Sequence, residues 1–230
     1  MKTIGLIGGM SWESTASYYR LLNEGIREKL GGFHSAKIIM HSVDFDEIHR
    51  LQHENRWNES GDILAKHAKA LEIAGADFIL ICTNTMHKVA HIIEKNITIP
   101  IVHIAQATAD ALKEEHCKKS ILLGTKFTMC ENFNKKILES NGIKIILPDE
   151  ENINTINSII FNELVLGKVL ETSKKKYIQI VENLCAHDKE IDSVILGCTE
   201  IGLLIKKDDI NLQIFDTTPL HVNKALQLAL

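Results

Sequence analysis

Apolar runs alternate with amphipathic stretches along the whole chain. Short runs rich in β-branched or apolar residues predict strands at 2–7, 37–41, 77–81, 99–104, 120–123, 144–147, 193–196 and 212–215. Longer stretches between them predict helices at 14–30, 60–74, 85–94, 104–115, 131–140 and 173–186. Continuous apolar strands are typical of a parallel sheet that is buried on both faces. The alternation therefore predicts an α/β fold built from right-handed βαβ units.

The two halves of the chain also resemble each other. Segment 76–81 matches segment 191–196 at an offset of 115 residues, and the matches at either end of the half-chain have offsets of 117 and 113. Loop-length changes within a duplicated fold produce such a drift. We therefore predict two pseudo-symmetric α/β domains, each with a parallel sheet of about four strands. The expected domains are residues 1–100 and 101–230, with segment 210–230 packing back on the first.

The alternative is one doubly wound domain whose generic strands resemble each other by accident. In either fold, ligands bind outside the carboxyl ends of the strands. With two pseudo-symmetric domains, that place becomes the cleft between them.

Charge and cysteine content exclude several classes of protein. The chain of 230 residues has 26 basic and 30 acidic side chains and a net charge of −4. This balance does not favour nucleic acid or an anionic membrane as a partner, and no apolar run approaches the roughly 18 residues of a membrane span. The five cysteines are widely spaced and form no CxxC pair. Such spacing favours a reduced, cytoplasmic protein over a disulfide framework or a zinc site.

The third predicted strand of each half ends in a polar cluster, residues 82–87 (CTNTMH) and residues 197–200 (GCTE). Backbone N–H groups at the mouth of a following helix can bind a carboxylate, and the helix field favours a thiolate. Within the repeat, Thr83 and not Cys82 is the counterpart of Cys198. The alternative for either cysteine is ordinary core burial, because free cysteine is among the most buried residue types.

Three motifs resemble the cofactor-independent aspartate/glutamate racemase family. They are residues 4–10 (IGLIGGM), Asn84-Thr85 and residues 197–200, and the resemblance covers essentially the whole chain. It implies two pseudo-symmetric α/β domains, a homodimer, and racemisation of a free amino acid without pyridoxal phosphate, other cofactor or metal. Family members use two cysteines on opposite faces of the substrate α-carbon, one to take the proton and one to return it.

The first motif departs from the family pattern. The family has Cys-Asn-Thr, whereas Thr83 precedes Asn84 here and Cys82 stands one residue earlier. A one-residue step along a strand turns the side chain to the opposite face, so Cys82 replaces the missing thiol only if the strand end bulges. The sequence resembles the family branch with a Thr/Cys pair, described as broad-specificity or as favouring L-Asp and L-Glu. We predict Cys198 and Thr83 as the catalytic residues, with unequal rates on the two enantiomers because a hydroxyl is a weaker acid and base.

The resemblance also implies a set of substrate contacts. Met10 is expected to offer its backbone N–H to a carboxylate, while Asn84, Thr85 and Thr199 hold the α-carboxylate and amino group. The remaining matched positions are Gln52, Thr128, Lys168 and Glu200.

Some of these roles have competing interpretations. Lys168, and secondarily Arg50, is a candidate partner of a side-chain carboxylate, with a solvated surface cation as the alternative. Glu200 is expected to orient the substrate amino group, or else to be an acid favoured by the field at the start of a helix. The acidic run 149–151 is predicted to be a solvated loop.

Other functions remain as alternatives. The glycine loop at 5–9 lacks the G-x-G-x-x-G order of a dinucleotide site, and the histidine pairs 87/91 and 49/53 lack the acid of a zinc motif. Within the same architecture, the rival enzymes are a maleate isomerase and a malonate-type decarboxylase. A binding protein without turnover is the rival from another class, because one of the two thiols is absent.

Overall fold

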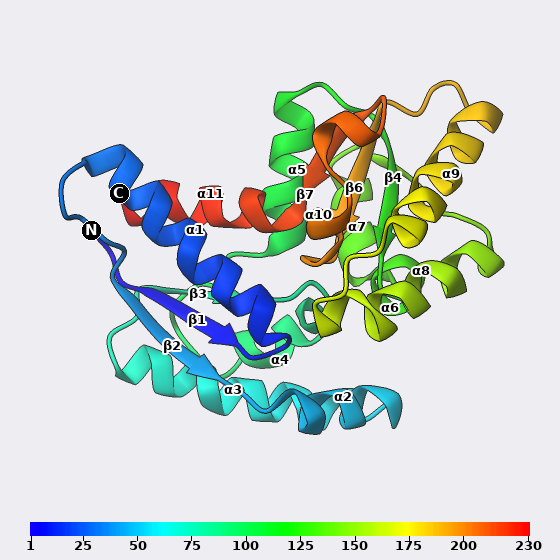
Figure 1. The fold of residues 1–230 in the computed structure, drawn as a ribbon. Coiled ribbons are helices and arrows are strands. Elements are labelled where there is room, and N and C mark those ends of the chain that lie inside the picture. The colour runs from blue at the N-terminus through cyan, green and yellow to red at the C-terminus, as the bar shows by residue number, and fades with distance from the viewer. The chain divides into compact units, whose positions relative to one another are not determined.

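Two parallel sheets organise the chain, whose computed structural model describes all of residues 1–230 (Figure 1). One compact unit, here called unit 1, comprises Met1–Ile104 and His221–Leu230. The other, unit 2, comprises Ala105–Leu220. The α/β fold with two parallel sheets confirms the fold class predicted from the sequence.

Unit 1 contains a three-stranded sheet in the order β2-β1-β3. Its strands are β1 (Ile4–Gly8), β2 (Ile38–Ser42) and β3 (Phe78–Ile81). Its helices are α1 (Trp12–Leu30), α2 (Phe45–His53), α3 (Trp57–Ile73), η1 (Thr85–Val89), α4 (Ala90–Glu94) and the part of α11 (Thr217–Ala229) that begins at His221.

The helices of unit 1 cover both faces of its sheet (Figure 1). Leu6 and Leu80 point to one face, where they pack with Tyr18 of α1 and Leu226 of α11. Helix α3 packs on the other face against β1 and β2. Full burial of such side chains contributes about 1.5–3 kcal/mol each, so the unit has a core of its own.

The prediction of a fourth strand at 99–104 was wrong. Only Ile101 pairs with the sheet, as an isolated bridge to Ile79. The segment makes two backbone bonds there, from the Ile79 N–H to the Pro100 carbonyl and from the Val102 N–H to the Ile79 carbonyl, both 2.9 Å long. Proline has no N–H to donate to a ladder, and helix α5 begins at Ile104. The extended segment is therefore too short to form a strand.

Unit 2 contains a four-stranded sheet in the order β5-β4-β6-β7, parallel throughout. Its strands are β4 (Lys119–Gly124), β5 (Lys144–Ile146), β6 (Ser193–Gly197) and β7 (Gln213–Asp216). Its helices are α5 (Ile104–Glu114), α6 (Lys126–Cys130), α7 (Asn132–Ser140), α8 (Glu150–Asn162), η2 (Leu164–Leu166), α9 (Glu171–His187), α10 (Ile201–Leu204) and η3 (Lys207–Asp209).

Alternation along β6 divides the core of unit 2 into two layers. Val194 and Leu196 point to the layer under α8 and α9, while Ile195 points to the layer that includes Leu112 of α5 and Leu138 of α7. This is the alternation that a strand buried on both faces requires.

The acidic run at 149–151 is not the predicted loop, because helix α8 begins there. The Asp149 side chain caps the helix by accepting a hydrogen bond of 2.8 Å from the Asn152 N–H. Ile153, Ile156 and Ile160 follow at helical spacing, and all three are buried. The acids lie at the N-terminus of the helix, where the positive end of the helix dipole stabilises their negative charge.

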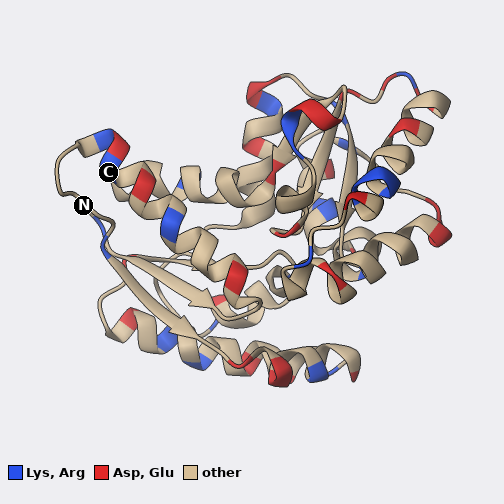
Figure 2. Cartoon of the chain, viewed as in Figure 1, with Lys and Arg blue, Asp and Glu red and all other residues tan.

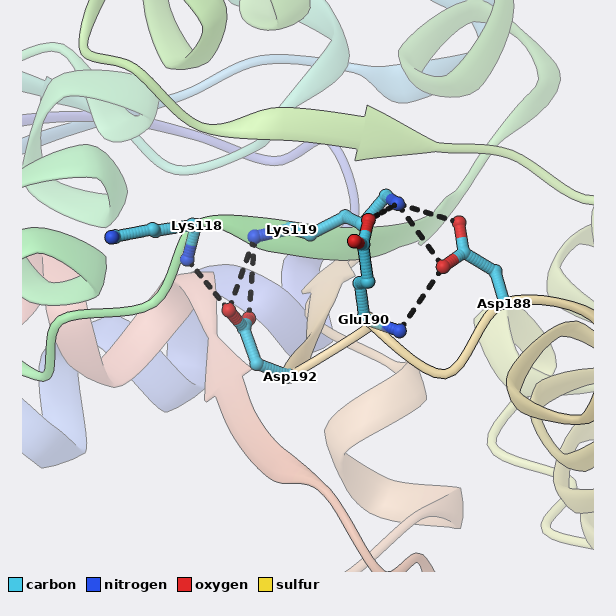
Figure 3. A network of polar contacts seen from close by, with 5 residues as sticks. All are labelled: Lys118, Lys119, Asp188, Glu190 and Asp192. Carbon is cyan, nitrogen blue, oxygen red and sulfur yellow. Dashed lines mark hydrogen bonds and ion pairs between the residues drawn. The ribbon is translucent and has the colours of Figure 1, made fainter.

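An aspartate fastens the amino ends of the central strands in each unit. In unit 2 the Asp192 carboxylate accepts hydrogen bonds from the Lys118 and Lys119 N–H groups (Figure 3). In unit 1 the Asp77 carboxylate accepts a hydrogen bond of 2.6 Å from the Thr3 N–H. The same contact at the same place supports the duplication inferred from the sequence.

Charged side chains of both signs are interspersed on the helices, and β1, β2 and β3 carry none (Figure 2). None of the helices has the length and apolar character needed to cross a membrane.

Candidate active site

Cys82 and Thr83 follow strand β3 directly and differ in their burial. The Cys82 N–H pairs with the Ile7 carbonyl at 2.9 Å, one residue beyond the end of β3, and the chain then turns, because the Thr83 N–H donates to the Ile81 carbonyl at 2.8 Å. The Cys82 side chain is completely buried in the core with Leu6 and Leu80, and burial raises the pKa of its thiol. Thr83 is partly exposed. The local geometry thus favours Thr83 over Cys82 as the group that meets a substrate.

The loop that follows β1 lies beside this strand end. Gly9 has a φ of +96°, and a Cβ at this position would lie 2.2 Å from the Val43 carbonyl oxygen, so the loop requires glycine. Next to it, Met10 is buried. The Ser14 hydroxyl donates a hydrogen bond of 2.7 Å to the Cys82 carbonyl and ties α1 to the end of β3. Unit 1 thereby brings the loop of Met10 to the end of the strand that precedes Thr83.

Asn84, Thr85 and Gln52 lie in the same region of unit 1. Asn84 and Thr85 are buried at the start of η1. Gln52 is buried on α2, and its amide donates to the Met86 sulfur at 3.0 Å. Arg50, on the same helix, is exposed. We call the region formed by Met10, Gln52 and residues 83–85 the first half-site.

His87 is buried beside the first half-site and contacts the backbone of Thr83. Its Nδ1 lies 2.9 Å from the Thr83 carbonyl oxygen, and its Nε2 lies 3.2 Å from the Ile104 backbone nitrogen. A carbonyl can only accept and an N–H can only donate, so the proton of the neutral ring is on Nδ1. Burial, together with His103 and His221, lowers the pKa of His87 well below its ordinary value. The neutral imidazole therefore holds the Thr83 backbone in place.

In unit 2, Cys198 directly follows β6 and is partly exposed. Its Sγ lies 2.9 Å from Oε2 of Glu200, which is buried. Burial, then the Glu200 carboxylate, and to a smaller extent Asp216, raise the pKa of the Cys198 thiol well above its ordinary value. This direction is opposite to the one expected from a helix N-terminus. Helix α10 has only four residues, so its field is small beside these carboxylates.

Thr128 lies beside the same strand end and is completely buried. A Cβ at Gly124 or Gly197 would lie 3.1 Å from the Thr128 side chain, so the two glycines make room for it. The Thr125 hydroxyl accepts a hydrogen bond of 3.3 Å from the Thr128 N–H and lies 3.2 Å from its hydroxyl. We call Thr128 together with residues 198–200 the second half-site.

Asp216 also belongs to the second half-site, although sequence reasoning missed it. It ends β7 and is the register partner of Leu196. A Cβ at Gly202 would lie 2.2 Å from Asp216 Oδ2, so the carboxyl occupies space that only glycine leaves. Burial raises the pKa of Asp216 to about 6. The signal in the sequence was an acid at the carboxyl end of the apolar run 212–215.

Thr199 and Lys168 also match the family motifs. Thr199 is partly exposed between Cys198 and Glu200. Lys168 is exposed on the loop after η2, an element that contacts α10. The substrate roles of all these residues stay predictions.

Comparison with known proteins gives full-length similarity to solved structures. A protein from Yersinia pestis whose crystal structure is described as that of a proposed Asp/Glu racemase is 45% identical, with a TM-score of 0.92 over 100% of this chain and 99% of that one. An aspartate racemase homologue from Pyrococcus horikoshii is 37% identical, with a TM-score of 0.87 over 100% of this chain and 99% of that one.

A curated relative is more distant. The broad specificity amino-acid racemase RacX of Bacillus subtilis is 24% identical over 151 residues, which is 66% of this chain. The match spans 64% of the relative's own length, less than two thirds of it. The family model of the Asp/Glu/hydantoin racemases matches residues 7–225. The resemblance noted in the three sequence motifs is thus confirmed, and the chain belongs to the Asp/Glu/hydantoin racemase family.

Proposed function

We propose that the protein racemises a free acidic amino acid, aspartate or glutamate, by proton transfer at the α-carbon without a cofactor. The observation that carries this proposal is the Cys198 thiol, which lies at a strand end 2.9 Å from a buried carboxylate. Thr83 is its counterpart in the repeat, since Phe78 and Ser193 open the two equivalent strands and each site residue follows five positions later. The full-length relatives that carry the names of Asp/Glu and aspartate racemases support the same reaction.

The chemistry needs a base on one face of the α-carbon and an acid on the other. In the proposed mechanism Cys198 removes the α-proton, and Thr83 returns a proton directly or through a water molecule. The electron pair left on carbon is delocalised into the carboxylate, which then needs hydrogen-bond donors. The Met10 N–H, Asn84, Thr85 and Thr199 are our candidates for these donors.

The acidic side chain of the substrate requires a cation, and Lys168 is our first candidate and Arg50 the second. Gln52 in unit 1 and Thr128 in unit 2, both buried, are proposed to contact the substrate. We further propose that the protein acts as a homodimer in the cytoplasm, and all five cysteines are free thiols, in keeping with a reducing compartment.

The test is incubation with L- and D-aspartate and L- and D-glutamate in D₂O, followed by chiral chromatography and mass spectrometry. The proposal expects inversion with one deuterium gained at the α-carbon, and loss of both in Cys198→Ala. Conversion of maleate, or loss of CO₂ from a malonate, without this exchange would favour the rival enzymes of the same architecture. A ligand-dependent rise in melting temperature without exchange would favour a binding protein.

A further inference from the structure

Both polar groups of the Thr83 backbone are hydrogen-bonded. The Thr83 N–H donates to the Ile81 carbonyl at 2.8 Å, and the Thr83 carbonyl oxygen lies 2.9 Å from Nδ1 of the buried His87. Threonine is branched at Cβ, so few side-chain rotamers are open to it once its backbone is fixed. The direction of the Thr83 hydroxyl therefore depends on a bond that a histidine side chain supplies.

The second half-site holds the matching carbonyl in another way. The Cys198 carbonyl accepts a hydrogen bond of 3.1 Å from the Ile201 N–H, so this contact lies within the backbone. Gly202, four residues after Cys198, occupies the position of His87 in the repeat. A Cβ on Gly202 would lie 2.2 Å from Oδ2 of Asp216, so unit 2 leaves no room for a side chain there. The imidazole contact is therefore particular to the first half-site.

The other ring nitrogen of His87 fixes the imidazole to a second element. Its Nε2 accepts a hydrogen bond of 3.2 Å from the N–H of Ile104, the first residue of α5. The N–H groups of a first helical turn have no acceptor within their own helix, so the imidazole satisfies one of them. One nitrogen must donate and the other must accept, and only the neutral ring with its proton on Nδ1 does both.

A second imidazole holds the segment that precedes α5. Nε2 of the buried His221 donates to the Val102 carbonyl at 2.7 Å, and the Tyr18 hydroxyl donates to its Nδ1 at 2.7 Å. The His221 ring also meets the His87 ring edge-on, with the centroids 5.7 Å apart. Helices α1 and α11 thereby hold the segment whose N–H group His87 accepts.

We propose that His87 is a positioning residue for Thr83: its Nδ1–H fixes the Thr83 carbonyl and so directs the hydroxyl that exchanges a proton with the substrate. This inference rests on the proposed racemase function. His87 gains and loses no proton during the reaction, because both ring nitrogens are engaged with backbone groups. The bond to Ile104 holds the ring, whereas the bond to Thr83 directs the hydroxyl. Substitutions that keep one bond and remove the other should therefore differ in activity.

Two amide substitutions separate the two bonds. In His87→Asn the amide nitrogen takes the place of Nδ1 and can donate to the Thr83 carbonyl, whereas in His87→Gln the amide oxygen takes the place of Nε2 and can accept from the Ile104 N–H. We expect kcat of His87→Asn to stay within about threefold of the native value. That of His87→Gln and of His87→Leu should fall about 10- to 100-fold, with KM changed less than about threefold. His91→Leu replaces an exposed histidine four residues further on and is the control.

Exchange of the α-proton in D₂O locates the defect. Deuterium that enters a substrate without inversion is exchanged on one face of the α-carbon, whereas inversion needs both faces. In His87→Gln and His87→Leu, inversion should fall about 10- to 100-fold. Exchange without inversion of the enantiomer that Cys198 deprotonates should fall less than about threefold. A general loss of folding would lower both rates by the same factor.

Hydrogen exchange of the peptide that covers residues 82–86 reports on the same bond without any substrate. Its amides should exchange about tenfold faster in His87→Gln and His87→Leu, but not in His87→Asn or His91→Leu. Native protection of this peptide in His87→Leu, or equal kcat in His87→Asn and His87→Gln, would overturn the inference. Equal losses of inversion and of one-face exchange would give His87 a purely structural role. Absence of racemisation by the native protein would contradict the proposed function, while hydrogen exchange would still report on the bond.

Discussion

Units 1 and 2 have similar backbones at the ends of β3 and β6, but the side chains that follow these strands have different chemical groups. Residues 83–85 supply a hydroxyl, an amide and a second hydroxyl, whereas residues 198–200 supply a thiol, a hydroxyl and a carboxylate. An aspartate bonds to the amino end of the central strand in both units. The two units thus share a scaffold, while the polar groups at the strand ends differ. Such a pair is expected to treat the two enantiomers unequally.

The units also differ in the kind of ionisable group that they bury. Unit 1 contains a cluster of three imidazoles, those of the buried His87 and His221 and of the half-buried His103, with the ring of His87 4.6 Å from that of His103 and 5.7 Å from that of His221. Unit 2 instead has the half-buried Asp216 near the Cys198 thiol, and desolvation of its carboxyl raises the pKa of Asp216 to about 6. Burial disfavours the charged form in both cases, so the two units should respond to pH in opposite directions.

The largest expected effect on activity comes from replacing Cys198, and replacement of Cys82 is its control. Cys198→Ala should lower the rate of α-proton exchange about 1000-fold, because a positioned acid–base group contributes about 10²- to 10⁴-fold. Cys82→Ala, in the core of unit 1, should leave kcat within about threefold and lower only the free energy of unfolding. Exchange into aspartate and glutamate in D₂O measures both. Loss of activity in Cys82→Ala without loss of folding would reverse the assignment of the two thiols.

Acidification from pH 7 to about 4.5 should lower the free energy of unfolding of unit 1 and raise that of unit 2. Burial lowers the pKa of His221 and of His103 to about 4, so the unfolded chain takes up their protons first and stability falls as pH falls from 6.5 toward 4. The carboxyl of Asp216 has a pKa of about 6 in the folded protein and an ordinary value of 3.8 in the unfolded chain. Its contribution to the stability of unit 2 is therefore lost as the pH rises from 3.8 to 6 and is regained on acidification. The effect is up to about 3 kcal/mol for His221 or Asp216.

Hydrogen exchange resolved by peptide measures this difference, with β1 and β3 reporting on unit 1 and β6 and β7 on unit 2. His221→Gln and Asp216→Asn are the matched variants, and each should flatten the response of its own unit. A response of the same sign in both units would refute the contrast.

Restoring a thiol to the first half-site should reduce the asymmetry. Thr83→Cys should raise the rate on the slower enantiomer about tenfold, because a thiol exchanges protons more readily than a hydroxyl. Thr83→Ser keeps the hydroxyl and serves as the control. The ratio of the two initial rates, measured by chiral chromatography, decides the matter. A ratio that is the same in all three proteins would remove Thr83 from proton transfer.

The smallest effect tests the histidine cluster alone. The Tyr18 hydroxyl lies 2.7 Å from Nδ1 of His221, whose Nε2 lies 2.7 Å from the Val102 carbonyl oxygen. Tyr18→Phe leaves the ring nitrogen without this partner and should cost about 1–2 kcal/mol of unfolding free energy. Tyr19→Phe changes an exposed neighbour and should cost almost nothing. Urea denaturation of the two variants gives the difference, and equal stabilities would show that the buried hydrogen bond contributes little.

Much of the fold could be predicted because apolar periodicity is local. Helix α8 has the same periodic signal in Ile153, Ile156 and Ile160, but the acids before them predict a loop, whereas they form the N-cap and first turn of the helix. The segment at 99–104 has strand-like composition, yet Pro100 limits it to a bridge. Both errors arise where a single residue decides whether an element begins or ends.

The candidate site was predictable only in part. Counting along the repeat placed Thr83 at the strand end and Cys82 one residue earlier, where the structure buries it. The raised pKa of Cys198 and the position of Asp216 depend on contacts among β6, β7 and Glu200. Such contacts join residues that are distant in sequence, so no local pattern gives their distances or burial.

The contacts of Asp77 and Asp192 lie at the amino ends of the strands, while the proposed catalytic residues follow the carboxyl ends. In unit 2, Lys119 adds ion pairs to Asp188 and Glu190 at that remote edge (Figure 3). The anchoring residues are therefore separate from those proposed for catalysis. A library that randomises only the loops after β3 and β6 can explore new amino-acid substrates while the anchors keep each sheet assembled.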